Sequence, residues 1–243
     1  MTFTAAAIAF AIGAGMGILG GGGSLVAIPA FTFMLHLPAK EAVVASLVVV
    51  GIAAAAGAIG AFMRKTIPLR VAMIVGASAA AGAFAGGLLG ARLDDGIQLA
   101  LLGGVMCGAA ILLWRQTEAA APTAHHARWV TLMSIGLVVG ALTGIVGVGG
   151  GFLMVPALII AGGMPMREAA AASLFVIAIA AFSGLVSYAG EVEVGWPAVL
   201  PMAAVAATGT LIGSALAWRL PQRRLQQAFA IALVCLGTFM LIR

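Results

Sequence analysis

Two short glycine runs are the part of this chain best suited to chemistry. They are Gly20–Gly23 and Gly147–Gly151, and a proline follows each of them. Consecutive glycines interrupt a helix, since each costs about 1 kcal/mol there relative to alanine. The helix that starts after such a break has free N–H groups and the positive end of its dipole, which bind anions without a basic side chain. The candidate binding residues of both runs and their surroundings are Gly20, Gly21, Gly22, Gly23, Ser24, Ser46, Gly147, Gly149, Gly150, Gly151 and Ser173.

The serines of this set leave two interpretations open. Ser46 and Ser173 each lie about two turns inside the helix that we expect after the glycine run. Their hydroxyls can hydrogen-bond an oxyanion, or they can only satisfy a backbone carbonyl. Ser24 stands where the second run has Gly151, so the two half-sites need not be equal.

The two runs belong to an internal duplication. Residues 13–57 return as residues 140–184 at a constant offset of 127, with about 20 identities in about 45 positions and no gap. Composition alone would give roughly a tenth, so the match indicates a true repeat. Two related halves with Gly/Pro-interrupted apolar segments in corresponding positions are typical of secondary transporters.

The composition predicts an α-helical integral membrane protein. The chain is 63% hydrophobic and 8% charged, whereas soluble domains have about 25% charged residues. Several apolar stretches reach the roughly 20 residues that a helix needs to cross a bilayer. Alternating strand patterns are absent, which argues against a membrane β-barrel. Ten helical pieces are expected, at about 3–20, 24–36, 40–63, 68–92, 97–114, 130–147, 151–163, 167–189, 196–218 and 223–242.

The elements that position the glycine runs form two halves. The predicted boundaries are residues 1–114 for the first repeat, 115–128 for a polar cytoplasmic linker and 129–243 for the second repeat, within one integrated transport domain. The short pieces 24–36 and 151–163 span only about 20 Å, less than the roughly 30 Å hydrocarbon core. Each glycine run therefore either breaks one spanning helix or forms the tip of a re-entrant hairpin.

Loop charges favour the hairpin. The first half has Arg64, Lys65 and Arg70 in the loop whose second-half equivalent has Glu191 and Glu193. Because cytoplasmic loops collect Lys and Arg, this reversal of sign predicts inverted-topology repeats. Each repeat would hold a Gly-broken re-entrant hairpin and three transmembrane helices, with both termini outside.

Other function classes receive little support. The net charge of +5 comes from basic residues dispersed between apolar spans, which is the membrane-loop pattern and not a nucleic-acid footprint. Cys107 and Cys235 fall inside apolar segments and indicate no disulfide framework. We find no metal-ligand cluster, no nucleophile with a base partner and no phosphate loop, so neither an enzyme nor a cofactor is expected. The first basic residue is Lys40, so no cleavable signal peptide is expected.

The paired glycine motifs resemble a known family. The first motif is Gly13-x-Gly15-x-Gly17-x-x-Gly20 through Gly23, followed by Pro29, and the second copy runs from Gly140 to Gly151, followed by Pro156. Both motifs are similar to the glycine motifs of the sulfite exporter TauE/SafE family, also called the 4-toluene sulfonate uptake permeases. The resemblance implies a transporter of sulfur-containing anions (sulfite, sulfonates or sulfoacetate) in the bacterial or archaeal cytoplasmic membrane. It also implies that the glycine runs are the substrate region.

The expected function is secondary transport of a small anion by alternating access, with the anion at helix N-termini near the membrane midplane. The alternatives are a passive anion channel on the same scaffold and a non-transporting membrane partner protein. The expected partners are the anion and the lipid bilayer. The substrate, the direction, the coupling ion (H⁺ or Na⁺) and the oligomeric state, a homo-oligomer included, stay open.

Overall fold

The computed structural model describes residues 3–34, 37–94, 96–98, 100–101, 103–104, 108, 129–147, 151–160, 162–188, 192 and 195–217. All regular structure in these ranges is helical, as predicted. The long helices are α1 (Phe3–Leu19), α3 (Ala39–Met63), α4 (Leu69–Gly90), α6 (Trp129–Val146), α7 (Gly151–Ile160), α8 (Met166–Ser187) and α9 (Trp196–Ala217). The predicted linker 115–128, the piece 223–242 and most of 97–114 lie outside the described residues.

Five of the described helices are long and apolar enough to cross a membrane. They are Lys40–Met63 within α3, and α4, α6, α8 and α9. Large apolar side chains remain exposed on the outer faces of these helices. Such surfaces are unfavourable in water and are expected where a helix faces the lipid bilayer. The most exposed of these side chains include Met63, Val130, Phe62, Val186 and Leu89. The chain is therefore built as a multi-pass membrane protein.

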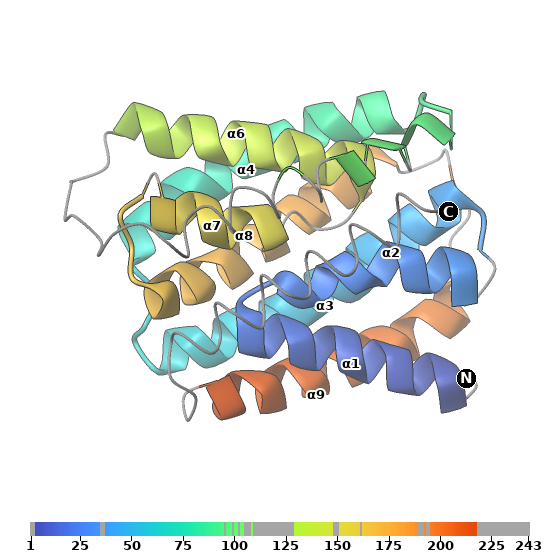
Figure 1. Ribbon diagram of the computed structural model, residues 1–243, viewed down its shortest axis with the longest axis horizontal. Coiled ribbons are helices and arrows are strands. Elements are labelled where there is room, and N and C mark those ends of the chain that lie inside the picture. Colours follow the sequence, from blue (N-terminus) through green and yellow to red (C-terminus); the bar gives the residue numbers. More distant parts are fainter. Residues whose placement is uncertain are drawn as a thin grey trace.

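The helices of the two halves interlock. In Figure 1, α4 and α6 form one flank and α1 and α9 the other, with α3 and α8 between them. Helices α4 and α9 are equivalent in the two halves, because adding 127 to the first and last residue numbers of α4 (Leu69–Gly90) gives those of α9 (Trp196–Ala217). The first helix of each half thus packs against the last described long helix of the other half. Contacts between α3 and α8, which are also equivalent, join the two halves at the centre.

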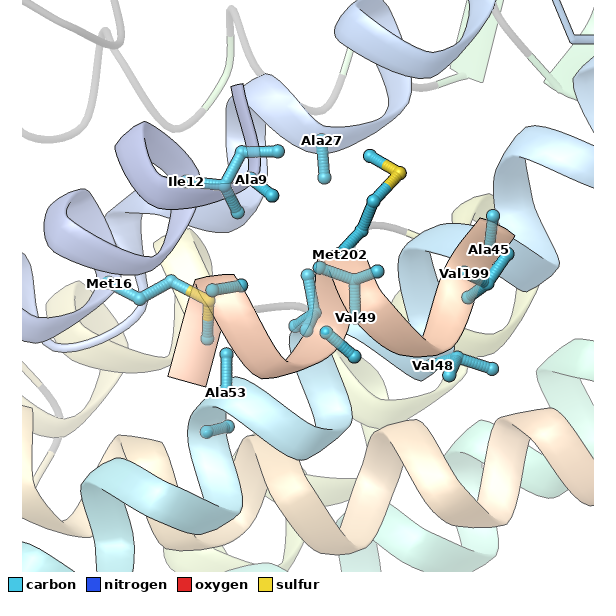
Figure 2. Close-up of a cluster of buried hydrophobic side chains, with 14 of the residues drawn as sticks. Ala9, Ile12, Met16, Ala27, Ala45, Val48, Val49, Ala53, Val199 and Met202 are labelled. Atoms are coloured by element: carbon cyan, nitrogen blue, oxygen red, sulfur yellow. The ribbon is translucent and has the colours of Figure 1, made fainter. Parts of the chain in front are cut away.

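Two apolar clusters form the core, and each mixes both halves. One joins α1 and α3 to Leu174, Val199 and Met202 of the second half, and Figure 2 shows its centre around Ile12 and Val49. The other joins α4 to α6, α7 and α8. Because both clusters use helices from both repeats, neither repeat buries its apolar faces alone.

Several glycines outside the two runs serve close helix packing, and Gly13, Gly17, Gly140 and Gly144 have the G-x-x-x-G spacing typical of it. A Cβ at Gly13 would collide with the backbone of Ala206 in α9, and a Cβ at Gly140 would collide with the backbone of Ala79 in α4. These contacts are equivalent under the offset of 127, with the halves exchanged. The repeat is therefore present in the packing as well as in the sequence.

The chain folds back at the first glycine run. Gly20 and Gly21 have φ angles of 69° and 121°, a left-handed region that favours glycine. After this turn, a Cβ at Gly23 would collide with the backbone of Ile12 and Met16 in α1. Residues 23 and 12 would lie about 16 Å apart in one straight helix, so the segment after the run lies against α1.

The segment after the first run differs from the regular helix predicted at 24–36. It consists of a 3₁₀ turn η1 (Gly22–Val26), a short α2 (Ala27–Pro29) and a π-helical turn η2 (Ala30–Met34). Pro29 has no N–H to give to the helix ladder, and the wider π turn starts directly after it. The second-half counterpart α7 contains Pro156 and ends at Ile160, three residues before the predicted end.

Candidate functional site

The two glycine runs meet at the centre of the molecule. A Cβ at Gly21 would lie 2.8 Å from the Cα of Gly151 and 2.5 Å from Cδ1 of Ile177. A Cβ at Gly151 would in turn lie 2.8 Å from the Cα of Gly21. Only residues without side chains allow the two backbones to approach so closely. The structure thus brings one run of each repeat to a common place.

Each run also rests on the third helix of the other half. Gly20 packs against Ala170 of α8, and Gly147, with φ of 75°, packs against Val43 of α3. Gly20 and Gly147 are equivalent under the offset of 127, and so are Val43 and Ala170. These two helices also have the candidate serines, which lie one turn further along.

The serines break this symmetry. Ser173 is fully buried, and its Oγ lies within hydrogen-bond distance of the carbonyl oxygens of Gly20 and Ala170. Its equivalent Ser46 is also fully buried, but its Oγ has no hydrogen-bond partner among the described residues. An unsatisfied buried hydroxyl costs about 1–3 kcal/mol. Ser46 is therefore the serine with a donor and acceptor left for a ligand.

Ser24 has a structural partner. Its Oγ donates to the Gly21 carbonyl at 2.7 Å, three residues back, and it is fully buried. This bond stabilises the tight turn at the start of η1. Because Gly151 stands at the equivalent position, the second half begins α7 without such a hydroxyl, and the two half-sites differ.

The remaining predicted site residues take different positions. Gly22 is buried in η1, and Gly23 is buried against α1, so Gly23 serves the fold-back and does not face the other repeat. Gly149 and Gly150 lie outside the described residues. Gly151 is the first described residue of α7. The described residues at the meeting point of the repeats are thus Gly20, Gly21, Gly147, Gly151 and Ser173.

A cavity leads from this region toward a positively charged surface. Its volume is about 60 Å³, and buried Gly20 and Gly57 line its inner part. By the same measure a single water needs about 10–15 Å³, so the cavity has room for several waters or one small oxyanion. Its lining residues are Gly17, Ile18, Gly20, Gly57, Ala61, Arg64, Thr66, Met166, Arg167, Ala170, Ala171, Leu174, Ser214 and Ala217.

The polar lining residues of the cavity were absent from the sequence-based site. Arg64 and Arg167 are exposed and belong to different repeats, while Thr66 and Ser214 add hydroxyl groups. The sequence pattern indicated Arg64 only as a marker of membrane topology. The joint position of Arg64 and Arg167 depends on how α3 packs on α8, which no local signal reports. Among the described residues two guanidinium groups and no carboxylate line the cavity, a balance of charge that favours anions.

Comparisons with known proteins find relatives that match almost the whole chain. The profile of the "Sulfite exporter TauE/SafE" family matches residues 5–240. The chain is 32% identical over 240 residues to a "Probable membrane transporter protein" of Xylella fastidiosa (strain Temecula1 / ATCC 700964), which covers 96% of this chain and 92% of that protein. It is 23% identical over 239 residues to the "Probable membrane transporter protein YdhB" of Bacillus subtilis (strain 168), with 96% and 98% covered. No solved structure matches the chain.

Proposed function

Because the chain belongs to the sulfite exporter TauE/SafE family of membrane transporters, we propose that it is a secondary transporter for a small sulfur-containing anion such as sulfite, a sulfonate or sulfoacetate. The observation that carries this proposal is the cavity between exposed Arg64 and Arg167 and the buried glycine meeting point. A tetrahedral or pyramidal oxyanion fits both its size and its charge. Transport is proposed to cross the bacterial or archaeal cytoplasmic membrane.

The proposed path has two stages. At the mouth, the guanidinium groups of Arg64 and Arg167 raise the local concentration of anions. Beyond the lining of this cavity, at the glycine meeting point, we propose that backbone N–H groups of the runs and the hydroxyl of Ser46 on α3, which has no partner among the described residues, replace part of the anion's hydration. This arrangement holds an anion without a buried positive charge, which would be costly in a membrane.

We propose that the repeats are inverted and that each glycine run is the tip of a re-entrant hairpin. The contacts between Gly23 and α1 support the hairpin, because they make the chain leave toward the side from which it came. A hairpin plus three spans gives each half an odd number of crossings, so the second half is inserted upside down. The basic 64–70 loop is then cytoplasmic, and the cavity opens to the cytoplasm.

Alternating access follows from this arrangement. We propose it because the equivalent contacts of Gly20 with Ala170 and of Gly147 with Val43 would allow two related conformations. An exchange between them would expose the same central place first to one side and then to the other.

Uptake into proteoliposomes tests the proposal. Radiolabelled sulfite, thiosulfate and a short sulfonate are supplied to the wild type and to Ser46→Ala, with gradients of H⁺ and Na⁺ tested separately. Ser134→Ala is the matched control, because Ser134 is exposed on α6 and its Oγ donates to its own helix at 2.9 Å.

We expect saturable uptake that falls about tenfold in Ser46→Ala and is unchanged in Ser134→Ala. Tenfold corresponds to about 1.4 kcal/mol, the worth of one hydrogen bond to a charged ligand. Unlabelled anion inside the vesicles should accelerate uptake, which a passive channel would not show. Absence of uptake for all three anions by folded protein would refute the proposed substrate class.

A further inference from the structure

The cavity beside Arg64 has a counterpart in the other half. Under the offset of 127, the lining residues Gly17, Ile18 and Ala217 correspond to Gly144, Ile145 and Gly90. These three residues also gather around one place, as the contacts of their backbone atoms show. Gly90, Gly144 and Ile145 therefore form a wall equivalent to part of the wall of the open cavity.

A tyrosine occupies this second site. Ala61 lines the open cavity, and its equivalent is Tyr188, the residue after the end of α8. The Tyr188 hydroxyl donates to the Gly144 carbonyl at 3.0 Å and lies 3.4 Å from the Ile145 carbonyl oxygen. A Cβ at Gly90 would collide with the same hydroxyl. The side chain is 1% exposed, so a large ring fills the space that a methyl group leaves empty in the other half.

Gln98 closes the same site from the next segment of the chain. Its Nε2 donates to the Ile145 carbonyl at 2.5 Å and to the Tyr188 hydroxyl at 3.1 Å. Gln98 is 2% exposed, and its Oε1 has no hydrogen-bond partner in the described part of the chain. The residue at the equivalent place is Leu225, which has no amide to give. The pair Tyr188–Gln98 thus has no match in the half with the open cavity.

We propose that Tyr188 and Gln98 are the gate that closes the second of two symmetry-related anion cavities. This inference rests on the proposed transport function. In the present conformation the cavity beside Arg64 is open and the gate is shut. In the alternate conformation the Tyr188 hydroxyl leaves the Gly144 and Ile145 carbonyls, and the anion passes on that side. The gate itself is made of the neutral side chains of Tyr188 and Gln98.

The gate can be tested by cysteine accessibility, without any substrate. Cys107 and Cys235 are first replaced by alanine, and a single cysteine is then introduced as Val44→Cys. Val44 is 2% exposed and is the equivalent of Ala171, which lines the open cavity. Ala171→Cys is the matched control. A membrane-impermeant maleimide is added to right-side-out or inverted vesicles, and the labelling rate is measured.

With Tyr188 present, Ala171→Cys should react from one side and Val44→Cys should react slowly from both. Tyr188→Ala gives the second site the residue found in the first. We expect it to raise labelling of Val44→Cys at least tenfold, and only from the side opposite to that of Ala171→Cys. Tyr188→Phe, which keeps the ring, and Gln98→Leu should each give a smaller increase on the same side.

Two results would overturn the gate. One is rapid labelling of Val44→Cys with Tyr188 intact. The other is unchanged slow labelling in Tyr188→Ala while Ala171→Cys in the same background still reacts normally. If Tyr188→Ala abolishes the Ala171→Cys reaction as well, the fold is lost, and unchanged rates in Tyr188→Phe and Gln98→Leu would then overturn the gate. Because no anion is needed, a failure of sulfite uptake leaves this result independent of the substrate class.

Discussion

Replacement of Gly21 by alanine tests the central contact between the repeats. Gly21 has φ of 121° and ψ of −10°, and a left-handed backbone costs a residue with a side chain about 1–2 kcal/mol. The new Cβ would lie 2.8 Å from the Cα of Gly151. Backbone atoms cannot rotate away, so overpacking adds about 1–3 kcal/mol. The total expected destabilisation of Gly21→Ala is about 2–5 kcal/mol.

Thermal unfolding of the purified protein in detergent measures this loss. At roughly 2–4 °C per kcal/mol for a chain of this size, Tm should fall by about 4–20 °C. Gly96→Ala is the matched control, because a Cβ at Gly96 meets nothing within 4 Å and Gly96 is helical. That substitution should leave Tm unchanged or raise it slightly. A Gly21→Ala protein with the Tm of the wild type would refute the described contact between the glycine runs.

Further predictions concern the cavity and the serine on α8. Ser173→Ala removes the donor to the buried Gly20 carbonyl and should destabilise the protein by about 1–3 kcal/mol in the same unfolding assay; an unchanged Tm would mean that the bond contributes nothing. Arg64→Gln and Arg167→Gln should each raise KM for the anion roughly two- to fivefold at low salt, with little change in kcat. This effect should fade as ionic strength rises, and a salt-independent change would speak against electrostatic attraction at the cavity mouth.

The helices of this protein were predictable from the sequence because their signals are local. The expected piece 68–92 is observed as Leu69–Gly90, and 167–189 as Met166–Ser187. Long apolar stretches bounded by Pro, Gly or charge need no tertiary information. The duplication also predicted which residues are equivalent, and the packing follows that equivalence.

The chemistry of the site was predictable only in part. The interpretation as a partner of a backbone carbonyl is realised at Ser173, which bonds a residue 153 positions away. Ser46 has no partner among the described residues, and its binding of an oxyanion stays a prediction. Identical residues at equivalent positions cannot reveal such a difference. The roles of Arg64 and Tyr188 depend on packing between halves, for which the sequence has no local signal. The π turn after Pro29 was also missed, because a proline predicts an interruption and not its form.

The interlocked packing of the helices has a consequence for ancestry. The first helix of each half, α1 or α6, packs against the other repeat, as the contacts of Gly13 with Ala206 and of Gly140 with Ala79 show. Before the duplication, a chain with a single repeat would have had no partner for that helix except a second copy of itself. A homodimer of such a chain would supply the same contacts, and fusion of two copies places them within one chain. Once both copies were joined, each was free to diverge, and a residue such as Tyr188 could arise on one side only.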